Sequence, residues 1–175
     1  MGERVYLGRH LLTDLLTEVA EELHQRKVVA QVFVVGGAAM ALGYDSERFT
    51  VDMDAIVLDG HGALTDAVHA VARRRGLLTS WFNENAAPFV SQVRDSRPLV
   101  VFDHPALRVF AASPEHLLAM KVVASRAGDV GDIRTLAGIL DVTTMSQVHD
   151  IVGRYFPLDA LNERAAMVLR DLFGE

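Results

Sequence analysis

The stretch 32–58 constrains the fold of this chain more than any other part of the sequence. It opens with an apolar run, 32–35, whose β-branched and aromatic residues predict a buried strand. The run ends at Gly36 and Gly37, and the residues that follow, 38–42, are good helix formers. The pattern therefore predicts a strand, a tight turn and a helix.

A second strand is predicted over 50–57, which is again rich in β-branched residues and carries Asp52 and Asp54. Because side chains alternate along a strand, both carboxylates are expected on one face, with Cα atoms roughly 6–7 Å apart. Two carboxylates so placed suit a hard divalent cation, Mg²⁺ or Mn²⁺. Such a cation clamps a triphosphate in phosphoryl or nucleotidyl transfer.

The glycine pair supplies the second half of such a site. A glycine turn lets the backbone approach a phosphate closely, and the N-terminus of the next helix presents unpaired N–H groups to an anion. Taken singly, a glycine pair is most often a plain turn, and two spaced aspartates are most often a solvated strand edge. Their combination at this spacing predicts a catalytic site, in which Gly36 and Gly37 seat phosphates and Asp52 and Asp54 bind metal.

Composition narrows the class of protein. With 175 residues, half of them apolar, the chain is long enough to bury one sizeable core. It has no cysteine, which excludes disulfides, thiolate zinc sites and a cysteine nucleophile. The net charge of -6 argues against a protein that coats nucleic acid by bulk electrostatics. We expect a cytoplasmic protein without a signal peptide or a membrane span.

One dense basic cluster, Arg73–Arg75, has two interpretations. Arginines in the last turn of a helix that ends at Gly76 complement the helix dipole. The same cluster also suits a contact with an RNA backbone, since arginine binds phosphates through forked hydrogen bonds. The sequence leaves both interpretations open.

The spacing of apolar residues in the rest of the first two thirds of the chain predicts helices around a sheet. The spacing of apolar residues indicates amphipathic helices over 10–26 and 63–75. Two strands joined by a turn are expected over 98–103 and 107–111. Asp103, at the end of the first of these strands, is the candidate for a third metal-binding acid.

The residues Ser113 and Pro114 mark the start of a later helix. Ser113 is a strong N-cap and Pro114 fits the first helical position, so a helix is expected from there to about Ala127. Lys121 lies among apolar residues on this helix, where a lysine is rarely buried without a partner. There are two alternatives for Lys121. Either its aliphatic stem is buried while the ammonium reaches water, or the ammonium is directed at a bound triphosphate.

Two acids follow this helix. Asp129 is placed to cap the next helix. Asp132, in the first turn of that helix, is the better candidate for a functional acid. It would pair with Lys121 or Arg126, or approach the metal.

Two groups of residues resemble the signature of the DNA polymerase β-like nucleotidyltransferase superfamily. The first group is a glycine pair that opens a helix, followed by spaced aspartates on the next strand: Gly36, Gly37, Thr50, Asp52 and Asp54. The second group is similar to small bacterial nucleotidyltransferases related to AbiE-type and MenT-type toxins: Ser113–Lys121, Arg126, Asp129, Asp132 and Ile133. A similar stretch with an asparagine occurs in the resembling proteins, which implies that Asn83 lies near the site.

The resemblance implies an α/β fold of the α+β kind. Residues 1–112 would form a polymerase β-like core, in which helices flank a mixed sheet. Residues 113–175 would form a C-terminal helical bundle packed on that core. Amphipathic spacing predicts two helices of this bundle, over 143–156 and 158–173.

The resemblance also implies an activity, which is metal-dependent transfer of NMP from an NTP to a hydroxyl. The implied acceptor is the 3′ end of tRNA, and the implied partner is the cognate antitoxin protein of a toxin-antitoxin system. The catalytic residues would be Asp52, Asp54, Lys121 and Asp132. The nucleotide would be bound by Gly36, Gly37, Thr50, Lys121 and Arg126. Nucleotidyl transfer to a small molecule or a protein, and a non-catalytic regulatory module of the same fold, are the alternatives.

Thr50 also indicates a means of regulation. Its hydroxyl lies two residues before Asp52 and hence on the same predicted strand face. A phosphate on Thr50 would add a charge of about -2 and compete with the triphosphate for metal and space. We hypothesise that this phosphorylation silences the site. Retained NTP transfer by the stoichiometrically phosphorylated protein would contradict the hypothesis.

Overall fold

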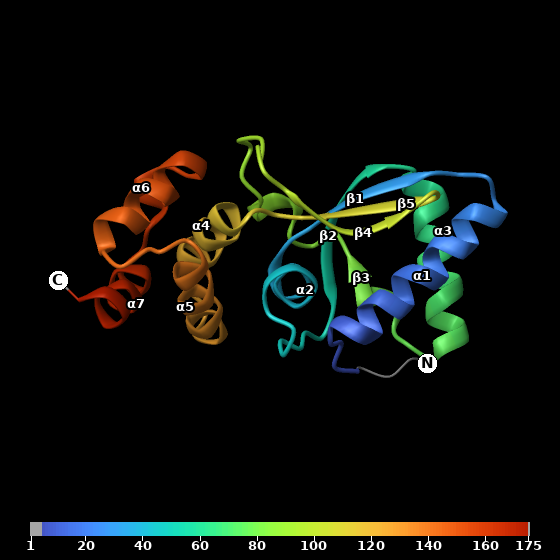
Figure 1. Ribbon diagram of the computed structural model, residues 1–175, viewed down its shortest axis with the longest axis horizontal. Helices are drawn as coiled ribbons and strands as arrows, with labels where there is room; N and C mark the ends of the chain where they lie inside the picture. The colour runs from blue at the N-terminus through green and yellow to red at the C-terminus, as the bar shows by residue number, and fades with distance from the viewer. Residues whose placement is uncertain (1–4, 175) are drawn as a thin grey trace. The chain divides into compact units, whose positions relative to one another are not determined.

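The computed structural model of this chain describes residues 5–174 (Figure 1). Within them, helices flank a five-stranded mixed sheet, so the predicted α+β class is confirmed. The described chain divides into two compact units. The first combines residues 5–88 with Pro98–Ala112, and the second combines Phe89–Arg97 with residues 113–174. The segment Phe89–Arg97 thus groups with the later helices, although the sequence division at residue 112 assigns it to the core.

The sheet lies in the first unit and has the strand order β3-β2-β1-β5-β4. Its centre is β1 (Ala30–Val34), which pairs antiparallel with β2 (Met53–Asp59) and parallel with β5 (Leu107–Ala111). Strand β4 (Leu99–His104) pairs antiparallel with β5, which confirms the predicted hairpin. The two-residue strand β3 (Phe82–Asn83) pairs parallel with β2.

Two helices of the first unit, α1 (Arg9–Gln25) and α3 (His61–Arg75), pack against each other and against strands of the sheet. Both match the predicted amphipathic helices, and the side chains of their apolar stripes are buried: Leu12, Leu15, Leu16, Val19, Leu23, Leu64, Val68 and Val71. Helix α3 ends at Gly76, whose left-handed φ of 68° costs a glycine little. Two short 3-10 helices, η2 (Thr79–Trp81) and η3 (Ala87–Phe89), follow it along the chain.

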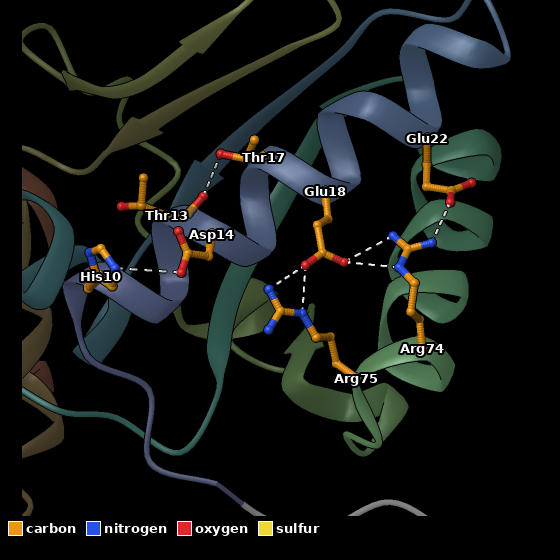
Figure 2. Close-up of polar contacts among 8 residues, drawn as sticks. All are labelled: His10, Thr13, Asp14, Thr17, Glu18, Glu22, Arg74 and Arg75. Atoms are coloured by element: carbon orange, nitrogen blue, oxygen red, sulfur yellow. Dashed lines mark hydrogen bonds and ion pairs between the residues drawn. The ribbon is translucent and has the colours of Figure 1, made fainter.

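A network of ion pairs joins α1 to the end of α3 (Figure 2). Arg74 donates to Glu22 Oε1 over 2.9 Å and to Glu18 Oε2 over 3.1 Å, and Arg75 donates to Glu18 Oε1 over 2.6 Å. Burial favours the neutral form of Glu18, but the hydrogen bonds from the two arginines outweigh it and lower the pKa of this carboxyl. Two of the three clustered arginines therefore serve helix packing.

The glycine pair opens a helical segment with two parts, α2 (Gly36–Ala39) and the π-helical turn η1 (Met40–Tyr44). Strand β2 begins three residues later than the sequence predicts. The reason is a different backbone pairing, because Leu7 and Thr50 exchange backbone hydrogen bonds over 2.7 and 3.0 Å. Asp52 therefore lies in the bend immediately before the strand.

Helices make up most of the second unit: α4 (Pro114–Ala124), η4 (Ala127–Asp129), α5 (Val130–Ile139), α6 (Met145–Tyr155), η5 (Leu158–Ala160) and α7 (Glu163–Phe173). Helix α4 contacts α5, α6 and α7. As predicted, Ser113 caps α4 and Pro114 occupies its first turn. The helix ends before the predicted residue because Ser125 adopts a left-handed φ of 44°. No helix within residues 5–174 is long and apolar enough to cross a membrane.

Asp95 attaches the segment Phe89–Arg97 to the start of α4. Its side chain, 5% exposed, accepts hydrogen bonds from Ser113 N over 2.7 Å and from Arg97 N over 3.1 Å. It also lies 3.3 Å from His116 Nδ1. Burial opposes the charge on Asp95, but the hydrogen bonds from His116 and the backbone outweigh it and lower the pKa of this carboxyl.

Replacing Asp95 with asparagine is expected to destabilise the protein by about 1–3 kcal/mol near pH 7, because the new amide nitrogen would face a backbone N–H. The lowered pKa sets the sign of the pH dependence. The stabilisation is fully present above the unfolded-state pKa of about 3.9 and is lost as the pH falls through the folded-state pKa. Denaturant unfolding of both proteins from about pH 7 to about pH 2.5 measures the difference. A difference that stays constant over this range would contradict the assignment.

Candidate active site

Gly36 sits at the point where β1 ends and α2 begins. Val35 N donates to Asp54 O over 3.0 Å, which fixes the glycine turn beside β2. Gly36 has a φ of +63°, a backbone conformation that residues with a side chain rarely adopt. A Cβ at Gly36 would lie 3.3 Å from Asp54 Oδ2, so the backbone of Gly36 approaches this carboxylate more closely than a residue with a side chain readily could.

Gly37 faces the segment that leads into β2. A Cβ on Gly37 would lie 2.7 Å from Thr50 Oγ1 and 3.8 Å from Arg48 Nη2. The Thr50 hydroxyl donates to Asp52 O over 3.0 Å. The backbone at the glycine pair thus lies close to a hydroxyl and a guanidinium, and this packing leaves no room for a side chain at position 37.

Asp52 is held from the other side by Asn83. Asn83 Nδ2 donates to Asp52 Oδ2 over 3.2 Å, and its Oδ1 accepts from Asn85 N over 2.9 Å. In the sheet register, Asn83 on β3 is the Cα partner of Asp54 on β2. The parallel pairing of β2 and β3 therefore brings the amide to the carboxylate pair, as the resemblance implies for Asn83.

Glu84 fastens the stretch that carries Asn83. Its carboxylate accepts from Val57 N over 3.1 Å and lies 2.7 Å from His61 Nε2. Because these contacts tie the residue after β3 to β2 and to the start of α3, they limit the movement of Asn83 relative to Asp52.

A divalent cation at this site would need oxygen ligands from a substrate as well as from the protein. Residues 5–174 contain no cluster of three His, Asp or Glu side chains that could bind a metal by themselves. Asp103, the candidate third acid, instead forms a forked pair with Arg108 over 3.0 and 3.2 Å at the end of the β4–β5 hairpin. Magnesium binds commonly through one or two carboxylates, with phosphate oxygens and waters completing its shell. Asp52 and Asp54 are the carboxylates that would serve such an ion here.

The remaining predicted site residues gather in the second unit. Lys121 Nζ donates to Asp129 Oδ1 over 2.9 Å and lies 2.8 Å from Asp132 Oδ2. All three side chains are largely buried, at 8%, 12% and 5% exposure. Asp129 Oδ2 also accepts from Arg126 N over 3.1 Å, a bond at the start of η4. Asp129 is the N-cap residue of α5, but its side chain makes no cap hydrogen bond to that helix, so the predicted capping role is wrong. The Arg126 side chain itself is exposed.

Arg48 is the site residue that sequence reasoning missed. It lies in the loop before Asp52, where the sequence offers no periodicity to place a side chain. Only the approach of this loop to Gly37 shows that its guanidinium belongs to the space around the glycine pair. The available signal was a basic residue four positions before the first aspartate.

Comparison with known proteins adds one positive result. A family model described as a nucleotidyltransferase of unknown function (DUF6036) matches residues 10–170. No curated protein and no solved structure gives a significant match. The matched range includes the glycine pair, the carboxylates beside it and the buried triad of the second unit. The chain belongs to this family of nucleotidyltransferases.

Proposed function

We propose that this protein transfers an NMP unit from an NTP to a hydroxyl and releases pyrophosphate. The observation that carries the proposal is the close approach of the glycine turn to the Asp54 carboxylate in the first unit. The backbone of Asp52 is bonded to the Thr50 hydroxyl, which lies beside Gly37. The family assignment supports transfer of a nucleotide as the reaction class.

In this proposal the first unit seats the triphosphate. The backbone of Gly36 and Gly37 approaches the phosphates, and the guanidinium of Arg48 offsets part of their charge. Asp52 and Asp54 would hold Mg²⁺ or Mn²⁺, which supplies charge stabilisation for the phosphate oxygens and the acceptor oxygen. Asn83 keeps the Asp52 carboxylate in place through its amide hydrogen bond.

Lys121, Asp132 and Arg126 have supporting roles in the proposal. An ammonium carries three N–H donors, and the two aspartates take two of them. The proposed role of Lys121 is to neutralise charge as pyrophosphate leaves, with Asp132 as the supporting acid that holds the lysine. Arg126, exposed on the same unit, would add a second cation to nucleotide binding.

For the acceptor we propose the 3′ end of tRNA, which would make the protein a growth-inhibiting toxin with a cognate antitoxin. The support is the resemblance of Ser113–Lys121 and the residues after it to MenT-type and AbiE-type proteins. A small-molecule or protein hydroxyl is the alternative acceptor, because the same carboxylates would serve it equally well.

The acceptor is tested by incubating the protein with total tRNA, Mg²⁺ and each of the four NTPs labelled on the α-phosphorus. Label on tRNA, removed by Asp52→Ala, is the expected result, and it also identifies the nucleotide. Label on protein or on small molecules from a cell extract, with none on tRNA, would replace tRNA as the acceptor. Absence of any metal-dependent NTP binding would favour a non-catalytic regulatory module.

A further inference from the structure

A pocket of about 210 Å³ opens beside Asp52 within the first unit. Six of its ten lining residues are apolar and come from the chain before α1, the bend before β2 and the stretch after α3: Val5, Leu7, Val51, Leu77, Leu78 and Trp81. Polar groups complete it: Asp52, Ser80, Asn83 and Asn85. None of the roles assigned so far uses this pocket as a binding site.

The pocket and the glycine turn lie next to different aspartates. Gly36 lies against Asp54, whereas the pocket is lined by Asp52 and by neither glycine. In an in-line displacement, the attacking oxygen and the leaving pyrophosphate lie on opposite sides of the reacting phosphorus, and a metal contacts both. If the glycine turn holds the leaving phosphates, the acceptor hydroxyl must arrive from another direction. The pocket next to Asp52 provides one.

We propose that this pocket receives the hydroxyl-bearing end of the acceptor. The inference rests on the proposed function, because it takes the phosphate seat at Gly36 as given. It assigns specificity to Ser80, Trp81 and Asn85, which the reaction itself does not need.

The lining defines the chemical class of the occupant. It contains one carboxylate and no lysine, arginine or histidine, so it disfavours an anionic group at this position. The apolar wall suits the face of a ring. The exposed side chains of Ser80 and Asn85 offer hydrogen bonds at the rim. Trp81 contributes an aromatic ring to the lining, and its buried indole Nε1 has no hydrogen-bond partner within residues 5–174.

A neutral, ring-containing alcohol about the size of one nucleoside meets these requirements. Two sources share this chemistry. One is the 3′-terminal nucleoside of an RNA, whose phosphate would stay outside the pocket. The other is a free nucleoside or a similar small alcohol. In both cases the ribose hydroxyl would face Asp52 and the ring would face the apolar wall.

Trp81 makes the proposal directly measurable, because it is the single tryptophan of the chain and lines the pocket. The probes are adenosine, guanosine, cytidine and uridine, each titrated to about 5 mM, a range that covers weak binding. At least one is expected to change the tryptophan fluorescence saturably. Ser80→Phe, which fills the pocket, is expected to weaken this binding at least tenfold. Thr79→Phe adds the same bulk one residue away, on an exposed residue outside the pocket lining, and should bind like wild type.

Asn85→Ala provides a second test that does not depend on added bulk. The backbone N–H of this residue makes the bond to Asn83, so removing the side chain leaves that bond in place. Its nucleoside affinity is expected to fall, while its binding of Mg²⁺ and NTP stays unchanged. Competition between NTP and the nucleoside would overturn the proposal, since the pocket would then hold the base of the NTP. No saturable fluorescence change with any of the four nucleosides would overturn it as well.

The outcome also separates the pocket from the proposed function. Nucleoside binding that Ser80→Phe abolishes, in a protein that transfers no NMP, would refute the function and leave the pocket as a binding site. Transfer with an unchanged acceptor KM in Ser80→Phe would keep the function and refute the pocket. If transfer occurs, the label incorporated into total tRNA is compared with the label incorporated into the free nucleoside. The substrate that takes up more label is the source of the acceptor.

Discussion

Replacing Asp54 with asparagine is expected to slow NMP transfer by about 10³-fold or more, without loss of the fold. The asparagine amide binds a hard cation far more weakly than a carboxylate does, and the charge stabilisation lost with the metal is worth about 4 kcal/mol or more. Asp54 is the carboxylate next to the glycine turn, so its loss should affect the bound triphosphate most directly. The rate of label transfer from NTP, measured with thermal unfolding of the same samples, checks both parts.

Asp59→Asn is the matched control for this experiment. Asp59 is also an aspartate of β2, but it is exposed and lies at the other end of the strand from the glycine turn. The control should keep the wild-type rate. If Asp54→Asn also kept that rate, the carboxylate would not hold the metal. An equal loss in Asp59→Asn would point to an effect of charge on the strand as a whole.

Replacing Lys121 with methionine is expected to destabilise the protein by about 3–5 kcal/mol, the usual cost of breaking a buried ion pair from one side. The substitution keeps the apolar stem but removes the Lys121 ammonium from two largely buried carboxylates, Asp129 and Asp132. Unfolding in urea, followed by circular dichroism, measures the change.

Lys27→Met is the matched control, since Lys27 is the other lysine of the chain and its side chain is exposed. It should change stability by less than about 0.5 kcal/mol, as is usual for surface substitutions. Adding Asp132→Asn to Lys121→Met should recover part of the loss, because one of the two carboxylates that lose the Lys121 ammonium becomes neutral. A Lys121→Met protein as stable as wild type would show that the triad contributes nothing to folding.

The parts of the site that the sequence predicts are those with a local cause. The glycine pair after the apolar run makes the predicted turn into a helix, since glycine adopts the positive φ of Gly36 at little cost. Ser113 and Pro114 likewise mark the start of α4 through local capping. These features needed no knowledge of distant contacts.

The remaining parts depend on pairing between distant segments. Strand β3 has only two residues, too few to show an alternating pattern, yet its pairing with β2 places Asn83 beside Asp52. Arg48 and the pocket at Trp81 arise in the same way, from loops that meet in space. The start of β2 also differs from the prediction because Thr50 pairs with Leu7, forty-three residues earlier by their numbers. The local secondary-structure propensity of a segment does not depend on such distant contacts, so it cannot predict them.

The most direct test of the central claim uses one NTP labelled in two positions, incubated with the protein, Mg²⁺ and a cell extract as the source of acceptors. If the protein transfers NMP, the label on the α-phosphorus enters the acceptor and the label on the γ-phosphorus leaves as pyrophosphate. Both changes should disappear in Asp54→Asn and persist in Asp59→Asn. Entry of the γ-label into the acceptor would show phosphoryl transfer instead, and transfer of neither label would contradict the assigned activity.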